Sequence, residues 1–292
     1  MKLRSQIRYL AEFLPGLVLM SLIRLTGLEL GGRLACFITC RIAPRLRVHK
    51  IALANLRAAF PDKNDDEIDQ LAMQMWENIG LVIAEYCNLR QLRRESSKRL
   101  KIIGEENALK AVEEGRGLIL FSAHMANWEA MSMAIDLVGL DAVGVYRHAN
   151  NPLFNKWMIR QRVRNVIPVQ VPKGADGAKA LVRSLKAGKT LCMLIDQKMN
   201  DGVPATFFGR PAMTASAAAG LARRYHVPVM LISAKRLQGS HFEVTFHAPF
   251  EAAKDGSQTK DILDTTQKMN DLMERIIRQS PAHWLWMHQR WS

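Results

Sequence analysis

His124 and Glu129 are the residues of this 292-residue chain whose types and spacing first suggest chemistry. They lie in the stretch FSAHMANWEA, residues 121–130, where an apolar run ends abruptly at the histidine. A histidine can accept a proton near neutral pH, and a carboxylate bonded to one ring nitrogen can fix its tautomer and leave the other nitrogen as a base. Residues five apart point about 140° away from each other in a continuous helix, so the pair can meet only if the backbone turns between them.

The sequence around the pair predicts such a turn. Residues 117–123 (GLILFSA) predict a buried strand, and a helix is expected from Asn127 to about Val138, capped by Asn127 or Ser122. His124 would then lie at the carboxyl end of a strand, where open α/β sheets bind ligands. The alternative is a structural histidine bonded to the backbone, with Glu129 in solvent.

The wider pattern predicts an α/β fold. Residues 64–89 first predict one long helix, because their apolar residues recur every three to four positions. Strands and helices then alternate, which favours a mixed, mostly parallel central sheet flanked by helices, with an antiparallel last pair of strands. The expected strands are 117–123, 141–147, 166–171, 190–196, 227–237 and 241–250, and the expected later helices lie near 127–138, 152–164, 175–187, 214–226 and 258–279.

Positive charge is concentrated at the N-terminal end. The net charge is +14, and residues 1–60 hold ten Lys or Arg but two acids, which attracts anionic lipid, nucleic acid or an acidic protein. The uncharged run Phe13–Ile23 has 11 residues, too few for a simple span of about 20. No A-x-A-like site follows it, which argues against a cleaved signal peptide. We expect residues 1–48 to form a membrane-associating helical segment and residues 49–292 a single α/β domain; the alternative is an ordinary amphipathic helix packed on that domain.

Four further residues are candidates for substrate binding or for stabilising an oxyanion. Arg147 and Asp196 follow strand-like runs as His124 does, so all three could face one pocket. Arg210 lies in FFGRPA, on a loop before a helix, and Asn127 lies in the turn itself. The eight histidines lack metal-ligand spacing, and P-loop, GxSxG and HExxH motifs are missing from the sequence, so we predict no metal site.

The expected helix at 152–164 carries basic residues and no acid. We interpret it as a surface for phosphates or for an acidic carrier protein, and the alternative is a solvated basic face. Its residues in this prediction are Lys156, Arg160 and Arg164, with Arg162 in the same run.

Several of these segments together resemble the late acyltransferases of lipid A biosynthesis, the lauroyl/myristoyl transferases of the lysophospholipid acyltransferase superfamily. The similar segments occur in the family's order and cover most of residues 50–292: NLRAAFPD (55–62), SAHMANWE (122–129), VYRHANNP (145–152), LIDQ (194–197), FFGRPA (207–212) and PAHWLWMHQRW (281–291).

The resemblance implies a membrane-associated O-acyltransferase. Its donor would be acyl-carrier protein, its acceptor a hydroxyl of a lipid A precursor, and its location the cytoplasmic face of the inner membrane. His124 would be the general base and Glu129 its partner. A thiolate leaves readily, so no metal or bound cofactor is expected.

Three other functions remain open at this level. The acceptor could be a lysophospholipid or another glycolipid, with acyl-CoA or acyl-carrier protein as the donor. Water could replace the acceptor, as in an acyl hydrolase. The chain could also be a basic membrane or nucleic-acid binder without catalysis, but it has no RNA-binding motif or disordered basic tail, so we expect no nucleic-acid partner.

Overall fold

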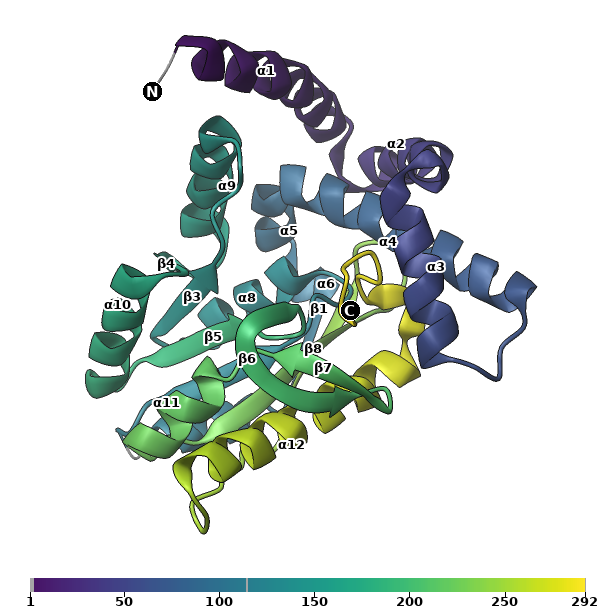
Figure 1. Cartoon of the computed structure of the whole chain (residues 1–292). Coiled ribbons are helices and arrows are strands. Elements are labelled where there is room, and N and C mark those ends of the chain that lie inside the picture. The colour runs from purple at the N-terminus through teal and green to yellow at the C-terminus, as the bar shows by residue number, and fades with distance from the viewer. Residues whose placement is uncertain (1–2, 114, 292) are drawn as a thin grey trace.

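A seven-stranded sheet forms the centre of the molecule (Figure 1). The computed structural model describes residues 3–113 and 115–291. The strands follow the spatial order β1-β9-β8-β2-β5-β3-β4. Their bounds are β1 Leu100–Ile103, β2 Leu118–Ser122, β3 Ala142–Tyr146, β4 Val169–Pro172, β5 Thr190–Leu194, β8 Val229–Arg236 and β9 Phe242–Phe246. Of these strands, only β1 lies in a segment for which the sequence does not predict a strand.

Most neighbouring strands run parallel. β2 pairs with β5 and β8, β3 pairs with β4 and β5, and β1 pairs with β9, all in parallel. β8 and β9 form the expected antiparallel pair. The predicted mixed, mostly parallel sheet is therefore confirmed. Because β2, β3 and β5 run in one direction, their carboxyl ends meet at one edge, where α/β sheets bind ligands.

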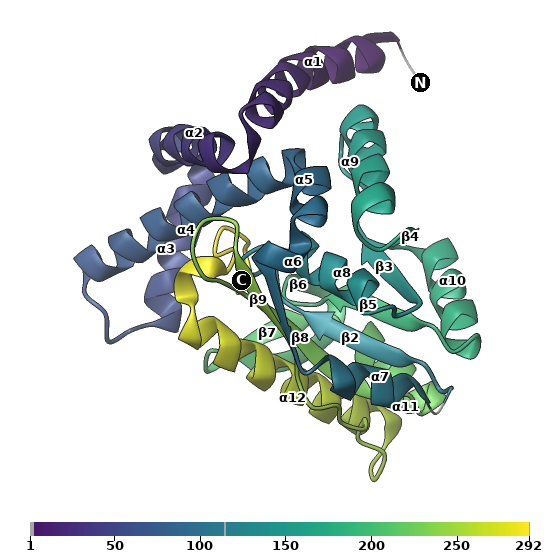
Figure 2. The same cartoon turned by 180° about the vertical axis from the view of Figure 1, so that it is seen from behind.

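Helices cover both faces of the sheet, which Figures 1 and 2 show from opposite sides. α7 (Glu105–Glu113) and α8 (Trp128–Leu137) pack on one face. α10 (Ala175–Lys186), α11 (Ala217–Tyr225) and α12 (Gln258–Gln279) pack on the other face. This double cover explains the continuous apolar character of β2, because a central parallel strand is buried on both sides.

A second, two-stranded sheet was not expected from the sequence. β6 (Lys198–Phe207) and β7 (Arg210–Thr214) form an antiparallel hairpin that packs on α12. The hairpin turns at Phe208 and Gly209, which both take a positive φ. After α12 the chain forms the short helix η2 (Pro281–His283) and then crosses the carboxyl edge of the sheet, where Trp284 and Trp286 are buried.

A layer of helices precedes the sheet. The long helix predicted from the sequence is confirmed as α4, Asp65–Cys87. Asn64 and Glu67 form a capping box at its start. The second helix of the layer packs tightly against the long one, since a Cβ on Gly80 would lie 2.6 Å from the Cα of Cys36. The helices are α1 Leu3–Leu25, α2 Gly27–Ile42, η1 Ala43–Arg45, α3 Arg47–Ala59, α4 Asp65–Cys87, α5 Leu89–Arg94 and α6 Ser96–Arg99.

α1 is the helix that stands furthest from this packed body (Figure 1). Its segment Ser5–Leu25 is long and apolar enough to cross a membrane, contrary to the expectation from its short uncharged run, and 6% of it is buried. Large apolar side chains along it are exposed, among them Leu14, Val18 and Leu25. α2 behaves differently, because it buries one face against α4. The division of the chain at residue 48 stays a prediction.

α9 (Pro152–Asn165) is one of the helices that pack against α1. The rings of Phe13 and Phe154 meet with their centroids 5.0 Å apart. The Asn151 side chain, which caps α9, donates to the carbonyl of Tyr9 at 3.0 Å. The same helix reaches the carboxyl edge of the sheet through Arg162, so it joins the apolar helix to the site described next.

Candidate active site

A tight turn links the end of β2 to the start of α8 and carries both residues of the His-x4-Glu pair. Ala126 takes a positive φ of 47°, and the Asn127 side chain then caps α8 by accepting a hydrogen bond from the N–H of Glu129 at 2.8 Å. The C-terminal segment fixes the turn, since Ala126 N–H donates to the carbonyl of His283 at 2.8 Å. The predicted turn between residues 124 and 129 is confirmed.

Asp196, just after β5, holds His124. Its Oδ1 lies 2.8 Å from Nδ1 of the His124 ring, and its Oδ2 accepts from the backbone N–H of His124 at 2.9 Å. The two residues meet because β2 and β5 are neighbours, with Ser122 opposite Leu194. Asp196 is 1% exposed, and its carboxylate faces the ring, which differs from the predicted role in substrate binding.

The surroundings keep the Asp196 carboxylate charged. Burial alone would raise its pKa, but the adjacent His124 ring, the hydrogen bonds from His124 and the indole N–H of Trp284 at 2.7 Å together lower that pKa. An ionised carboxylate can only accept, so Nδ1 of His124 carries the proton in this contact. In the neutral ring, Nε2 is then the nitrogen that can accept a proton.

Glu129 pairs with Arg162 of α9. The guanidinium donates to Oε1 from Nε at 2.9 Å and from Nη2 at 2.6 Å, and the Glu129 side chain is 2% exposed. Burial alone would lower the pKa of Arg162, but the facing carboxylate raises it overall. Two other contacts thus replace the expected hydrogen bond between His124 and Glu129: Asp196 holds Nδ1 of the ring, and Arg162 draws the Glu129 carboxylate toward α9.

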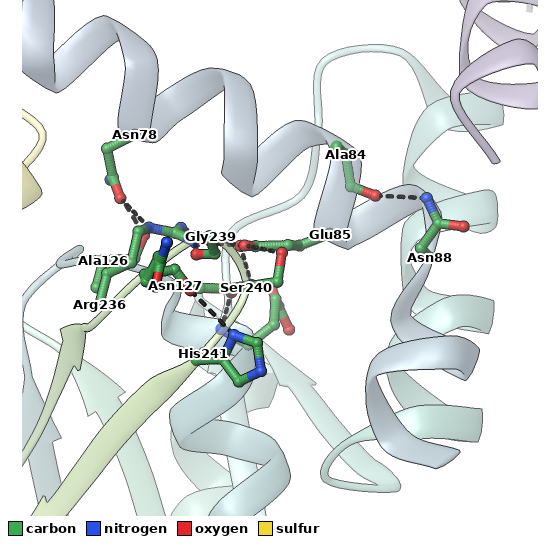
Figure 3. A network of polar contacts seen from close by, with 12 residues as sticks. Asn78, Ala84, Glu85, Asn88, Ala126, Asn127, Arg236, Gly239, Ser240 and His241 are labelled. Carbon is green, nitrogen blue, oxygen red and sulfur yellow. Dashed lines mark hydrogen bonds and ion pairs between the residues drawn. The ribbon is translucent and has the colours of Figure 1, made fainter. Parts of the chain in front are cut away.

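A buried polar network lies behind the turn (Figure 3). Glu85 of α4 is fully buried, accepts from Asn127 Nδ2 at 2.8 Å and forms a two-point ion pair with Arg236 of β8. Arg236 also donates to Asn78 at 2.8 Å, and Asn78 donates to the carbonyl of Ala126. Asn127 is itself fully buried, so its side chain caps the helix and joins this network instead of reaching the substrate as predicted.

A cavity of about 380 Å³ opens beside the turn. His124, Trp128 and Glu129 contribute to its wall, and the Trp128 ring stands edge-on to the His124 ring at 5.1 Å between centroids. The volume is in the range of small-molecule sites. The wall is mostly apolar, which suits a ligand with a hydrocarbon part; its apolar residues include Leu120, Met131, Ile135, Val145, Met158, Leu194 and Ile232.

His288 and Gln197 also line this cavity. The His288 ring centroid lies 6.2 Å from that of His124, and its Nε2 lies 2.9 Å from Nε2 of Gln197. Burial is the main cause that lowers the pKa of His288, and the charge of Arg147 adds to it, so the ring is neutral and accepts from the Gln197 amide. The C-terminal segment therefore contributes directly to the cavity.

The other predicted residues fall in separate places. Arg147 follows β3, is exposed and lines the cavity, so the structure brings it together with His124. Arg210 lies on the β6–β7 hairpin with its guanidinium over the ring of Trp291 at 5.5 Å, and the structure does not bring it to the cavity wall. Three basic side chains are exposed on α9: Lys156, Arg160 and Arg164.

Sequence reasoning missed the site roles of Arg162 and Trp284. Arg162 lies among four basic residues on one helix, and the sequence holds no signal that singles it out as the one turned inward. Trp284 lies in the C-terminal segment 281–291, which the sequence singled out through the resemblance to a family. Within residues 3–113 and 115–291, no group of three His, Cys, Asp or Glu side chains is arranged to hold a metal ion.

The fold and this site define an α/β protein in which a strand-end histidine, held by a buried aspartate, lines an apolar cavity. The whole chain, residues 1–292, matches the family described as bacterial lipid A biosynthesis acyltransferase, and it belongs to that family. It is therefore an acyltransferase.

Curated relatives share about a fifth of their residues with this chain. A lipid A biosynthesis lauroyltransferase of Escherichia coli is 22% identical over 83% of this chain and 78% of its own length. A lipid A biosynthesis palmitoleoyltransferase of the same organism is 22% identical over 88% and 84%. The solved 1-acyl-sn-glycerophosphate acyltransferase of Thermotoga maritima covers 83% of this chain and all of its own, with 13% identity and a TM-score of 0.38. The family assignment rests on the sequence match.

Proposed function

We propose that this protein transfers a fatty acyl chain from acyl-carrier protein to a hydroxyl of a lipid A precursor. The observation that carries this proposal is the contact between His124 and Asp196 beside an apolar cavity, in a chain of the lipid A acyltransferase family. The relatives in Escherichia coli are lipid A acyltransferases by name, which supports lipid A as the acceptor.

In the proposed reaction His124 acts as the general base. Its Nε2 takes the proton of the acceptor hydroxyl while the hydroxyl oxygen attacks the carbonyl carbon of the acyl thioester. Asp196 holds the ring and stabilises the imidazolium that forms. The tetrahedral intermediate collapses, the carbon–sulfur bond breaks, and the imidazolium returns the proton to the leaving thiolate. The products are the acyl ester and the free thiol.

The oxyanion of the intermediate needs a donor. Three backbone N–H groups of the turn already donate within the protein: His124 to Asp196, Met125 to the carbonyl of Ala123, and Ala126 to the carbonyl of His283. Arg147 lines the same cavity and is exposed. We therefore assign the oxyanion to Arg147, and we assign to Glu129 and Arg162 the role of holding the wall around Trp128.

The donor and the acceptor would meet near α9. The exposed Lys156, Arg160 and Arg164 suit an acidic carrier protein, because complementary charge steers association. α9 also contacts α1, whose apolar side chains suit a bilayer. This arrangement supports a site at the inner membrane with the catalytic domain on the cytoplasmic face.

Mass spectrometry of lipid A from cells with and without the gene tests the proposal. We expect lipid A to lose one acyl chain in the deletion strain, to regain it with the wild-type gene and not with His124→Ala. An unchanged acyl count would contradict lipid A as the acceptor.

The purified protein then separates the donors and the rival reactions. We expect transfer from acyl-carrier protein to exceed transfer from acyl-CoA. Fatty acid released at full rate without an acceptor would indicate a hydrolase, and preferred transfer to a lysophospholipid would indicate a different acceptor class.

A further inference from the structure

We propose that Gln170, whose side chain lies against Gly144, forms the closed end of the acyl pocket and limits the length of the chain that is transferred. This inference rests on the proposed acyl transfer and adds to it a residue that sets chain-length specificity. Gln170 belongs to the edge strand β4, and Gly144 faces it in the neighbouring strand β3.

Gly144 is in the middle of β3, where a glycine usually weakens a strand and marks a close approach. Its φ lies outside the left-handed region, so the backbone conformation does not require glycine. Space does require it: a Cβ at this position would lie 2.8 Å from Nε2 and 3.3 Å from Cδ of Gln170. The Gln170 amide therefore occupies the space that a side chain at position 144 would fill.

A hydrogen bond holds the Gln170 side chain in this position. Its Nε2 donates to the carbonyl of Ile167 at 2.8 Å, which fixes the amide against the sheet. Gly144, Gln170 and Cys192 all line the cavity. The strand pairing places Leu120, Cys192, Gly144 and Gln170 in one row across the sheet, so the amide stands at the edge-strand end of that row.

The cavity runs from His124 toward this row. Trp128, Met131 and Ile135 line it along successive turns of α8, which lead away from the histidine. His124 lies four residues beyond Leu120, or about 13 Å at the usual rise of a strand. The Gln170 amide lies against Gly144, two strand spacings or about 10 Å across the sheet from Leu120, so it is about 16 Å from His124. An extended chain advances about 1.2 Å per bond, so this distance corresponds to about thirteen bonds of a saturated acyl chain.

An acyl chain that reaches the Gly144 end of this row meets the Gln170 amide. A longer chain would press its methyl end onto that polar group and cut it off from water without offering a hydrogen bond, which is unfavourable. A shorter chain would leave apolar wall uncovered. The amide thus disfavours chains beyond the row.

Two substitutions test this role in the full-length protein. Gln170→Ala removes the end wall, so the donor chain with the highest kcat/KM should become longer by about two to four carbons, the reach of the lost side chain. Gly144→Ala pushes the amide into the cavity, so the preferred chain should become shorter by about two carbons. In the double variant the added methyl no longer meets the amide, and the preference should return toward longer chains.

Val169→Ala is the matched control. Val169 precedes Gln170 on β4, points to the opposite face of the sheet and is 42% exposed. We expect its chain-length profile to match the wild type.

A binding measurement separates this proposal from the proposed function. Saturated fatty acids of increasing length can be titrated into wild type and variants, with calorimetry as the readout, and this requires neither acceptor nor transfer. Binding preferences that shift as predicted, without any transfer to lipid A precursors, would support the pocket end and contradict the acceptor. Unchanged preferences in folded Gln170→Ala and Gly144→Ala proteins, in binding and in transfer, would overturn the proposal.

Discussion

The two residues of the His-x4-Glu pair lie on opposite sides of one turn and have different surroundings. His124 has a side chain that is 20% exposed toward the cavity, and a buried aspartate from another strand holds its ring. Glu129 has a side chain that is 2% exposed, and an arginine from α9 binds it at two points. His124 therefore faces the cavity, whereas Glu129 is held in place against α9.

This difference shows that the two side chains, although five residues apart in sequence, are not bonded to each other. The spacing brings two separate pairs, His124 with Asp196 and Glu129 with Arg162, to neighbouring parts of one cavity wall. We propose that the first pair serves the chemistry and that the second holds the shape of the site. Substitutions in the first pair should therefore lower mainly the rate of transfer, and substitutions in the second pair mainly the stability of the fold.

The largest effect is expected for His124→Ala. Loss of the base should lower kcat/KM for acyl transfer by about 10³-fold or more, because general-base catalysis contributes on that order. The variant should still fold, but with a lower unfolding midpoint, because the buried Asp196 carboxylate loses its ring partner. Near-normal transfer by a folded His124→Ala protein would remove His124 from the mechanism.

Asp196→Asn should have the next largest effect. An amide can donate to Nδ1 and so favour the wrong tautomer, which should lower kcat by about 10²-fold or more while KM changes little. The lowered pKa of Asp196 adds a stability effect: the ionised carboxylate stabilises the fold above its ordinary pKa of about 3.9, and this is lost as pH falls through the folded-state pKa. Steady-state kinetics and unfolding at several pH values measure both effects. An Asn variant with wild-type kcat would show that the contact is structural only.

Glu129→Gln should act mainly on stability. Arg162 would keep a buried charge with a weaker partner, so the free energy of unfolding should fall by about 3 kcal/mol, as for other broken buried pairs. Transfer should fall about tenfold through a displaced wall, with an unchanged pH profile. The double variant Glu129→Gln with Arg162→Gln removes the stranded charge and should recover part of the stability. A loss of activity as large as in His124→Ala would make Glu129 a direct participant.

The smallest effect concerns His283, whose carbonyl holds the turn. Burial, followed by the positive charge of Arg236 and Lys235, lowers the pKa of the His283 ring to about 4. A base with a lowered folded-state pKa stabilises the fold fully above its ordinary pKa of about 6.5 and loses that contribution as pH falls toward 4. His283→Phe should flatten this slope in urea unfolding, whereas the control His226→Asn, at an exposed position with positive φ, should keep it. An equal slope in His283→Phe would exclude this ring.

The sequence was sufficient to predict the alternation of strands and helices, because central strands buried on both faces carry continuous apolar runs. It was not sufficient for β1, which is short, nor for the hairpin of β6 and β7, whose polar first half does not alternate with apolar residues. The apolar content of α1 was underestimated, because isolated charges divide its run.

The contacts of the site could likewise be predicted only in part from the sequence. Asp196 could be recognised as a strand-end residue, but its pairing with His124, 72 positions away, depends on β5 lying next to β2 in the sheet. The alternation of strands along the chain does not give their spatial order. Glu129, close in sequence, was therefore the visible partner, and Arg162 was hidden among other basic residues.

The most direct test is a double-mutant cycle on kcat/KM that combines His124→Ala separately with Asp196→Asn and with Glu129→Gln. If Asp196 acts through His124, its substitution should cost little once the imidazole is gone, whereas Glu129→Gln should keep its roughly tenfold penalty in the His124→Ala background. The opposite pattern, with Asp196→Asn costing its full factor and Glu129→Gln costing nothing without His124, would contradict the pairing of His124 with Asp196 as the catalytic unit.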